Sequence, residues 1–108
     1  MSKNKGFSET SAGRYSLALY ELATEANMLS EIEVHSVSII NLITLSEDFK
    51  SLIKDPTNNK EDQLNALNKI SDQYKLNELL TKFLSFLISK RRFFYVEKIL
   101  KSFVDTCS

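Results

Sequence analysis

The residues that could perform chemistry are few and isolated. His35 is the only histidine and Cys107 the only cysteine among the 108 residues. A structural zinc site needs four such ligands, and a cysteine nucleophile needs a basic partner and an activating environment. Nothing in the sequence supplies either. We therefore expect no metal site and no cofactor, with His35 as a solvent-facing or partly buried helix residue and Cys107 on the apolar side of a terminal helix.

Two pairs of neighbouring carboxylates, Glu47 with Asp48 and Glu61 with Asp62, are a second candidate for chemistry. Paired carboxylates can act as general acid and base. Both pairs, however, stand at the start of segments with helical periodicity, where the positive end of the helix dipole favours acidic side chains. The two glycines form no phosphate-cradling loop. The sequence predicts a protein that is not an enzyme.

The segment KRRFFY, from Lys90 to Tyr95, combines three basic and three aromatic residues. Such a cluster could stack on and neutralise single-stranded nucleic acid. The chain as a whole has 14 basic and 14 acidic residues, so no net charge draws it to nucleic acid or an anionic bilayer. The simpler interpretation is that the three cations favour the negative end of a helix while Phe93 enters the core.

The elements that must position these residues are helices. With two glycines and one proline, the chain has fewer turn-makers than a sheet protein of this length needs. Helical periodicity appears in residues 11–25, 28–45, a short segment around 49–53 that ends before Pro56, a segment from about 59, and residues 76–90 and 93–106. β-branched residues in 28–45 also allow a strand, but the alternation breaks at HSVSII. We expect an all-α bundle of five or six helices, as a single domain over residues 1–108.

Two of these helices carry more apolar surface than one core requires. In residues 76–90 the apolar side chains span roughly 200° of the helix, against about 100° for packing on one core. The inward side of that helix is predicted to be Leu80, Leu84, Leu87 and Ile88. The surplus face is Leu79, Phe83 and Phe86, edged by Lys82 and Lys90, and in residues 11–25 it is Tyr15, Ala18 and Leu22.

This surplus surface has three interpretations. Both helices could lie centrally and bury both faces within the bundle. Alternatively, a groove between them could receive an amphipathic helix from another protein. A self-associating bundle, in which the groove closes on a second copy, is the third.

The segment RYSLALYELA, residues 14–23, resembles the RYAxALFxxA signature that opens the delta subunit of bacterial proton-translocating ATP synthase, called OSCP in mitochondria. LIKDP, LLTKFLSFLISKRR and a closing KSFVD follow in the family's order, so the resemblance covers essentially the whole chain. Two departures are Ser16, where the family often has Ala, and Ser89 with Lys90, where it commonly has Glu-Asn.

The resemblance implies a six-helix bundle of the OSCP/delta N-terminal domain type. It further implies a non-catalytic peripheral-stalk (stator) adaptor on top of the catalytic head, which resists rotor torque so that proton flow is coupled to ATP synthesis. The N-terminal helical segment of an alpha subunit would lie on the first and fifth helices. Carried over by position, its contacts would be Tyr15, Ala18, Leu22, Leu79, Lys82, Phe83, Phe86 and Lys90.

The family's proteins carry a further C-terminal domain that contacts the b-type stalk, and we expect this chain to lack it. Apolar runs here are far shorter than the roughly 20 residues of a membrane span, and MSKNKGFSETS lacks the apolar region of a secretory signal. We expect a soluble protein, monomeric in isolation, with no direct membrane insertion and no nucleic acid partner. It would lie at the cytoplasmic face of the bacterial inner membrane within the ATP synthase complex. The alternative is a helical nucleic-acid-binding or regulatory module that uses Lys90 to Tyr95.

Overall fold

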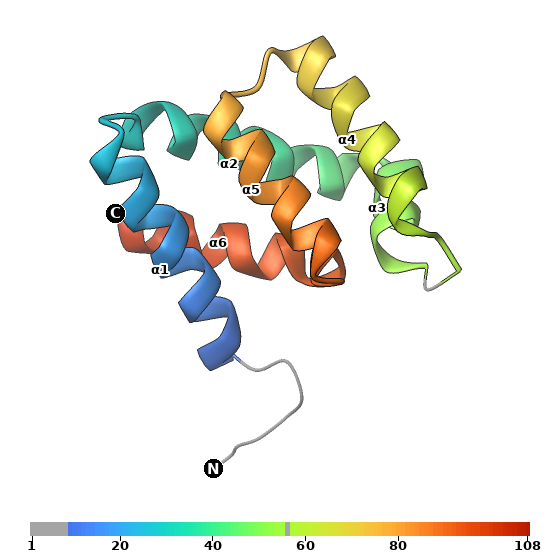
Figure 1. Cartoon of the computed structure of the whole chain (residues 1–108), viewed down its shortest axis with the longest axis horizontal. Coiled ribbons are helices and arrows are strands. Elements are labelled where there is room, and N and C mark those ends of the chain that lie inside the picture. Colours follow the sequence, from blue (N-terminus) through green and yellow to red (C-terminus); the bar gives the residue numbers. More distant parts are fainter. Residues whose placement is uncertain (1–8, 56) are drawn as a thin grey trace.

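The computed structural model describes residues 9–55 and 57–108, and these form a helical bundle (Figure 1). The predictions that involve residues 1–8 and Pro56 lie outside the described residues. No β-strand occurs in the described part of the chain, so the all-α prediction is confirmed and the strand alternative for residues 28–45 is wrong. The helices are α1 (Glu9–Glu25), α2 (Leu29–Leu45), α3 (Glu47–Lys54), α4 (Lys60–Tyr74), α5 (Glu78–Ser89) and α6 (Val96–Cys107), with a 3₁₀ turn η1 (Phe93–Tyr95) before α6.

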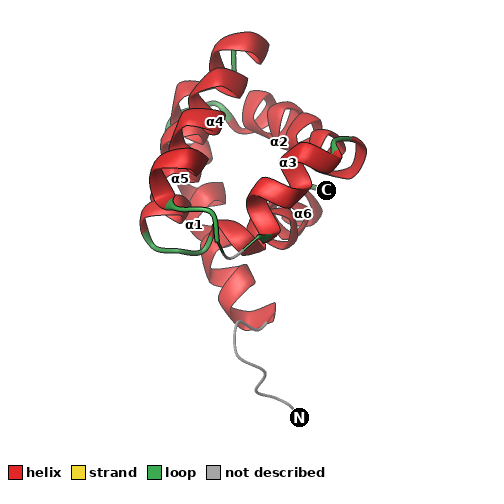
Figure 2. Cartoon of the chain, turned by 90° about the vertical axis from the view of Figure 1, so that its right-hand side faces the viewer, coloured by secondary structure: helices red, strands yellow, loops and turns green. Residues whose placement is uncertain are grey.

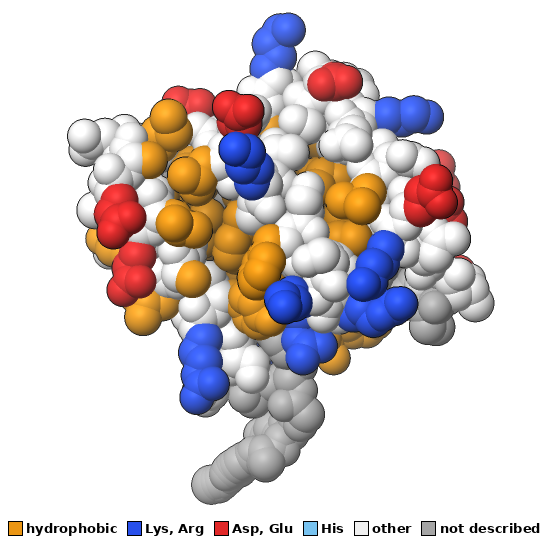
Figure 3. Space-filling view, viewed as in Figure 1, with side chains coloured by type: hydrophobic (Ala, Val, Ile, Leu, Met, Phe, Trp, Pro, Cys, Tyr) orange, Lys and Arg blue, Asp and Glu red, His pale blue; other side chains and the backbone are white. Residues whose placement is uncertain are grey.

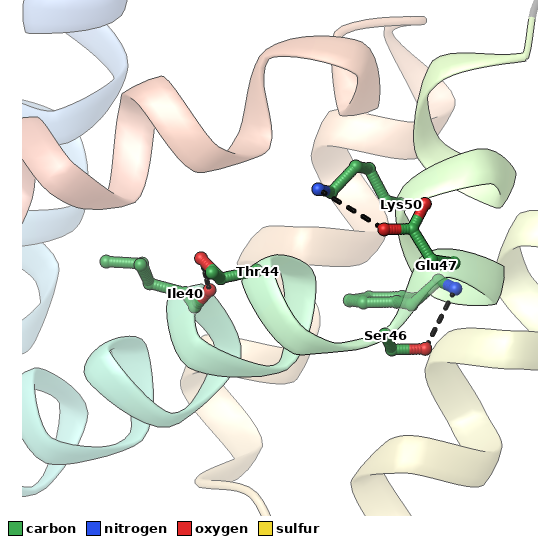
Figure 4. Close-up of polar contacts among 6 residues, drawn as sticks. Ile40, Thr44, Ser46, Glu47 and Lys50 are labelled. Atoms are coloured by element: carbon green, nitrogen blue, oxygen red, sulfur yellow. Dashed lines mark hydrogen bonds and ion pairs between the residues drawn. The ribbon is translucent and has the colours of Figure 1, made fainter.

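Side-chain caps explain where α3 and α4 begin. The Ser46 hydroxyl accepts a hydrogen bond from the Phe49 N–H at 3.1 Å (Figure 4), and the Asn59 Oδ1 accepts one from the Asp62 N–H at 2.8 Å. Glu47 and its neighbour Asp48 lie in the first turn of α3, where Glu47 also forms an exposed ion pair with Lys50 at 4.0 Å (Figure 4). The acidic pairs therefore stabilise helix starts, as the sequence predicts.

Left-handed residues end three of the helices. Asn27, Lys75 and Arg91 have φ values of 58°, 54° and 59°. In each case the next residue donates its N–H to a carbonyl five residues earlier: Met28 to Ala23 at 2.9 Å, Leu76 to Ser71 at 3.1 Å and Arg92 to Leu87 at 2.8 Å. This is the Schellman arrangement, which satisfies carbonyls at the helix end and turns the chain sharply. The short loops of the bundle follow from it.

The core is built around α6, which packs against α1 and α2 (Figure 1). The predicted inward side of α5 is fully buried. Most of the apolar side of α6 is fully buried as well, and Val104 and Cys107 near its end are partly buried. Seen from the side, α1, α4 and α5 lie on one flank, while α2, α3 and α6 lie on the other (Figure 2). The fully buried residues of α5 and α6 are Leu80, Leu84, Leu87, Ile88, Val96, Ile99, Leu100 and Phe103.

Among the described residues, three buried polar side chains interrupt this core. The Ser16 hydroxyl lies 3.0 Å from the Gly13 carbonyl oxygen and 3.0 Å from the Ser102 hydroxyl, which links α1 to α6. Asn77 caps α5 and is described with the site below. Ser36, on the buried side of α2, has no hydrogen-bond partner for its hydroxyl among the described residues.

Leu22 and Tyr74, large side chains near helix ends, are substantially exposed: Leu22 of α1 is 45% exposed and Tyr74 of α4 is 43% exposed. Tyr74 is the last residue of α4, where the chain turns toward α5. Leu22 belongs to the face of α1 that the sequence predicts as surplus apolar surface. The last helix also begins at Val96 rather than near residue 93, because Phe93 to Tyr95 form the 3₁₀ turn.

Candidate partner-binding groove

The candidate site lies between α1 and α5, which run in opposite directions on the same side of the molecule (Figures 1 and 2). The N-terminal part of α1 therefore faces the C-terminal part of α5. Their side chains meet where the Tyr15 and Phe86 rings approach, with centroids 6.4 Å apart and an interplanar angle of 54°. This pair joins the two surplus apolar faces that the sequence indicates.

Asn77 fixes the position of α5. Its Oδ1 accepts hydrogen bonds from the Leu79 and Leu80 N–H groups at 2.8 and 3.2 Å, which caps the helix. Its Nδ2 donates to a Glu31 carboxylate oxygen at 3.0 Å, and its backbone N–H donates to the His35 Nδ1 at 2.8 Å. Because Glu31 and His35 belong to α2, this buried residue ties the start of α5 to α2.

A hollow of about 550 Å³ lies beside the Tyr15–Phe86 pair. Ala18 forms part of its wall, and the absence of a large side chain there leaves room, as the sequence suggests. The Lys90 ammonium lies 5.7 Å from the centroid of the Phe86 ring at the edge of the same region. The hollow is lined by Ser11, Arg14, Tyr15, Ala18, Phe86, Arg92 and Tyr95.

Seven of the eight predicted contact residues are at least partly accessible. Phe86 is 46% exposed, Leu22 is similarly open, and Tyr15 and Leu79 are half-buried. Ala18, Lys82 and Lys90 are exposed. Figure 3 shows the result as a band of hydrophobic side chains on the face that carries α1 and α5, with basic side chains toward its lower end.

Phe83 does not belong to this exposed set, and its prediction as an accessible contact is wrong. It is only 6% exposed and forms part of the hydrophobic core. Phe83 lies three residues from Phe86, about 60° around the helix, which is enough to move a side chain from the open face to the interior. The periodicity alone gave no reason to separate the two phenylalanines.

The sequence prediction missed four residues of the hollow: Ser11, Arg14, Arg92 and Tyr95. Ser11 and Arg14 precede Ala18 by seven and four residues, so helical spacing could have placed them on its face. Arg92 and Tyr95 come from the connection between α5 and α6, and no periodicity within one helix indicates that this connection returns to α1.

The other candidates for chemistry give no site. The described residues contain no group of three or more potential metal ligands. Partial burial, and to a smaller degree the negative charge of Glu33, raises the pKa of the Cys107 thiol above its ordinary value, which disfavours the reactive thiolate. His35 is partly buried, as expected, and accepts the Asn77 hydrogen bond.

In the basic and aromatic segment from Lys90 to Tyr95, Phe94 is exposed and Tyr95 is half-buried. Phe93 is buried in the core, as the simpler interpretation predicts. The exposed Phe94 ring is already engaged, with the Lys54 ammonium 4.2 Å from its centroid and the Tyr95 ring 5.1 Å away.

A larger hollow, of about 630 Å³, lies on the other side of Tyr95 along α6. Its charged groups largely satisfy one another or the backbone: Lys101 pairs with Glu97 at 3.2 Å, and the Lys54 ammonium donates to the Phe94 carbonyl oxygen at 3.2 Å. The smaller hollow between α1 and α5 is the better candidate site, because the Tyr15–Phe86 pair beside it joins the surplus apolar faces of two helices. The aromatic rings of the larger hollow, Phe94 and Tyr95, are neighbours in sequence that pack on each other.

Comparison with known proteins identifies the family of the chain. The sequence model of the family described as ATP synthase delta (OSCP) subunit matches residues 12–108. The chain belongs to the ATP synthase delta (OSCP) subunit family. The matched region includes every predicted contact residue of the groove.

Individual delta-family relatives are close in sequence. The chain is 92% identical over all 108 residues to the ATP synthase subunit delta of Pelagibacter ubique (strain HTCC1062), and covers 58% of that protein. It is 36% identical over 92 residues to the ATP synthase subunit delta of Chelativorans sp. (strain BNC1), with 85% of this chain and 50% of that protein covered. The chain thus spans about half the length of the curated relatives it matches.

A solved structure supports the delta-family fold. A chain of the Toxoplasma gondii mitochondrial ATP synthase hexamer, determined by cryo-electron microscopy, superposes with a TM-score of 0.80 at 24% identity. The match covers 85% of this chain and 51% of that one. At this identity the likeness shows the six-helix fold. Within the described residues, no helix combines the length and apolar character needed to cross a membrane.

The two departures from the delta-family signature have local structural roles in this chain. Ser16 is buried and exchanges a hydrogen bond with Ser102 of α6. Ser89 donates its hydroxyl to the Phe86 carbonyl oxygen at 2.8 Å, next to the groove. Neither departure alters the bundle or closes the space between α1 and α5.

Proposed function

We propose that this chain is the adaptor of the ATP synthase stator that holds an alpha subunit through the groove between α1 and α5. In this role the groove receives the N-terminal helical segment of the alpha subunit on top of the catalytic head. The observation that carries the proposal is the partly exposed Tyr15–Phe86 pair beside an open hollow, on two helices whose other apolar faces are buried in the bundle.

The groove has the composition of a helix-binding surface. Large aromatic side chains near the centre of an interface contribute most of its binding energy, and Phe86 with Tyr15 occupies that place. Leu22 and Leu79 extend the apolar surface along the two helices. Lys82 and Lys90 are exposed at the edge, where charged side chains set partner choice more than affinity.

The proposed role is mechanical and non-catalytic. A stator resists the torque of the rotor, so that proton flow is coupled to ATP synthesis, and this requires tight binding without a chemical step. The remaining part of a full-length delta subunit would contact the b-type stalk. The chain would then be a peripheral component at the cytoplasmic face of the bacterial inner membrane.

A titration of the 108-residue chain with a peptide of the Pelagibacter ubique alpha-subunit N-terminus tests this proposal. We expect saturable binding and amide chemical-shift changes concentrated at Tyr15, Ala18 and Phe86. Sedimentation of the chain alone should show a monomer, whereas a dimer whose interface covers the same residues would mean that a second copy fills the groove. Changes confined to another face of the molecule would also refute the proposal.

A nucleic-acid-binding or regulatory module remains the alternative function, and the described contacts do not favour it. Its stacking surface would depend on Phe94, since Phe93 is buried. An oligonucleotide titration distinguishes the two functions: strongly salt-sensitive binding without any response to the peptide would support the alternative.

A further inference from the structure

Charged side chains are ordered along the outer edge of α1. Arg14, Glu21 and Glu25 are all exposed, and their spacing of seven and four residues places them on one face of the helix. They lie beside the groove residues Ala18 and Leu22. Along about 16 Å of helix, this edge changes from basic at the N-terminal end to acidic at the C-terminal end.

The antiparallel helix α5 adds basic and acidic side chains at the same two ends of the groove. Its C-terminal end brings Lys90 next to Phe86, and Arg92 lines the hollow together with Arg14. Its first turn, at the opposite end, carries the exposed Glu78. Lys82 is exposed midway along the helix. Figure 3 shows this distribution, with Lys and Arg side chains toward the lower end of the hydrophobic band and Asp and Glu side chains along its left edge.

We infer that this charge order selects both the partner's charge pattern and its direction. The inference rests on the proposed function of the groove. The occupant is an amphipathic helix of another protein with acidic side chains at the end that lies over Arg14 and Lys90, and basic side chains at the end that lies over Glu21 and Glu25. In the reversed orientation, acidic side chains of the partner would lie over Glu21 and Glu25, and basic ones over Arg14 and Lys90. The repulsion between these like charges disfavours that orientation.

The chain direction of the occupant follows from helix electrostatics. An isolated helix is stabilised by acidic residues in its first turn and basic residues in its last. A helix with that common pattern matches the groove when its N-terminus lies at the Arg14 end. The bound helix therefore runs parallel to α1 and antiparallel to α5.

Two peptides test the inference. Both retain the apolar residues of the Pelagibacter ubique alpha-subunit N-terminus, and their charged residues are rearranged: one has acidic residues in the first half and basic residues in the second, and the other has the reverse order. Each carries a nitroxide label at its N-terminus. Paramagnetic broadening of the amides of the isotope-labelled chain then reports which end of the groove the peptide N-terminus occupies.

We expect the acidic-first peptide to broaden amides around Arg14 and Lys90, and the basic-first peptide to broaden amides around Glu21 and Glu25. If both labels broaden the same end, packing rather than charge sets the direction, and the inference is overturned while the groove remains a docking site. If neither these peptides nor the unaltered alpha-subunit peptide binds, the proposed function fails together with the inference.

Charge reversal in the chain provides the second readout. Each exposed charge pair at the rim is worth a factor of about two to five in affinity. The double variant R14E/K90E should therefore bind the acidic-first peptide about tenfold more weakly at low salt, and high salt should reduce this difference. Lys69→Glu, which reverses one exposed cation of α4 instead of two, is the control and should leave the affinity unchanged. A loss of comparable size per reversed charge in the control would show that net charge, and not its order along the groove, is recognised.

Discussion

Phe83 and Phe86 lie three residues apart on α5 but have different environments, so we expect their substitution to have different effects. Phe86 is half-exposed beside Tyr15, whereas Phe83 is buried in the core. We expect Phe86→Ala or Tyr15→Ala to weaken the alpha-subunit peptide complex by about 1 to 3 kcal/mol while the chain stays folded. Phe83→Ala should instead lower the free energy of unfolding by about 3 to 5 kcal/mol.

Calorimetric titration and urea unfolding of the three variants separate these effects. Leu17→Ala is the matched control, since Leu17 is 51% exposed on α1 but points away from the groove. It should change neither quantity appreciably. If Phe86→Ala unfolds the chain, its assignment to the open face is wrong.

Asn77 is a residue whose contribution exceeds that of an ordinary helix cap. Asn77→Ala removes the cap of α5 and leaves a Glu31 contact unmade, so we expect a loss of about 1 to 3 kcal/mol in unfolding free energy. Asn59→Ala removes only the exposed cap of α4 and should lower it by about 1 kcal/mol. Equal losses would show that the side-chain bond from Asn77 to Glu31 contributes nothing.

We expect replacement of Ser36 and of Ser16 by alanine to change the melting temperature in opposite directions. Ser36 is fully buried, and its hydroxyl has no partner among the residues the structure describes. Ser36→Ala should raise the melting temperature, because removing an unsatisfied buried hydroxyl gains about 1 kcal/mol. Ser16→Ala breaks the bond to Ser102 and should lower it. A loss of stability in both variants would mean that Ser36 has a partner in solution.

Residue patterns predicted the apolar core better than its polar exceptions. Leu80, Leu84, Leu87 and Ile88 were identified by spacing alone, because the interior of a bundle accepts one face of each helix. Ser16 and Ser36 were not, because a hydroxyl reads as polar and only the tertiary structure shows which of them faces a bonding partner.

At the scale of the elements, the left-handed residues at the ends of helices give a specific prediction for stability. Lys75 and Arg91 occupy left-handed positions that glycine adopts without steric penalty. Lys75→Gly and Arg91→Gly should each raise the free energy of unfolding by about 0.5 to 1 kcal/mol. Asn27→Gly is the control and should gain less, since asparagine tolerates this conformation.

Urea unfolding of the three glycine variants checks this order. A loss of stability in Arg91→Gly alone would show that its side chain, rather than its backbone conformation, matters at the end of α5. The position of Asn27 as a helix stop was readable from the sequence because asparagine is common there. The same role for Lys75 and Arg91 was not, because neither residue type signals a turn.

Helical periodicity predicts the helices but not which of them pack against each other. The six helical segments follow from the 3.6-residue repeat, and the caps Asn59 and Asn77 mark two starts. That α1 lies against α5 came from the family resemblance rather than from the repeat. The contribution of Arg92 and Tyr95 to the hollow depends on the path of the α5–α6 connection, which only the structure shows.

At the scale of the whole molecule, a chain of zero net charge presents an apolar band on the face drawn in Figure 3, and the charges that flank this band change sign from end to end. This arrangement suits a subunit that must hold one helix in one orientation under mechanical load. In the proposed stator role, the bundle holds α1 and α5 beside each other, and the groove and its charge order determine how the partner helix binds.

The most direct test of this account is an amide chemical-shift map of the chain during titration with the alpha-subunit peptide. The account predicts saturable binding, with changes that follow Tyr15 and Ala18 on α1 and Phe86 and Lys90 on α5. Binding that leaves these residues unchanged and perturbs the outer face of α2 or α4 would contradict it.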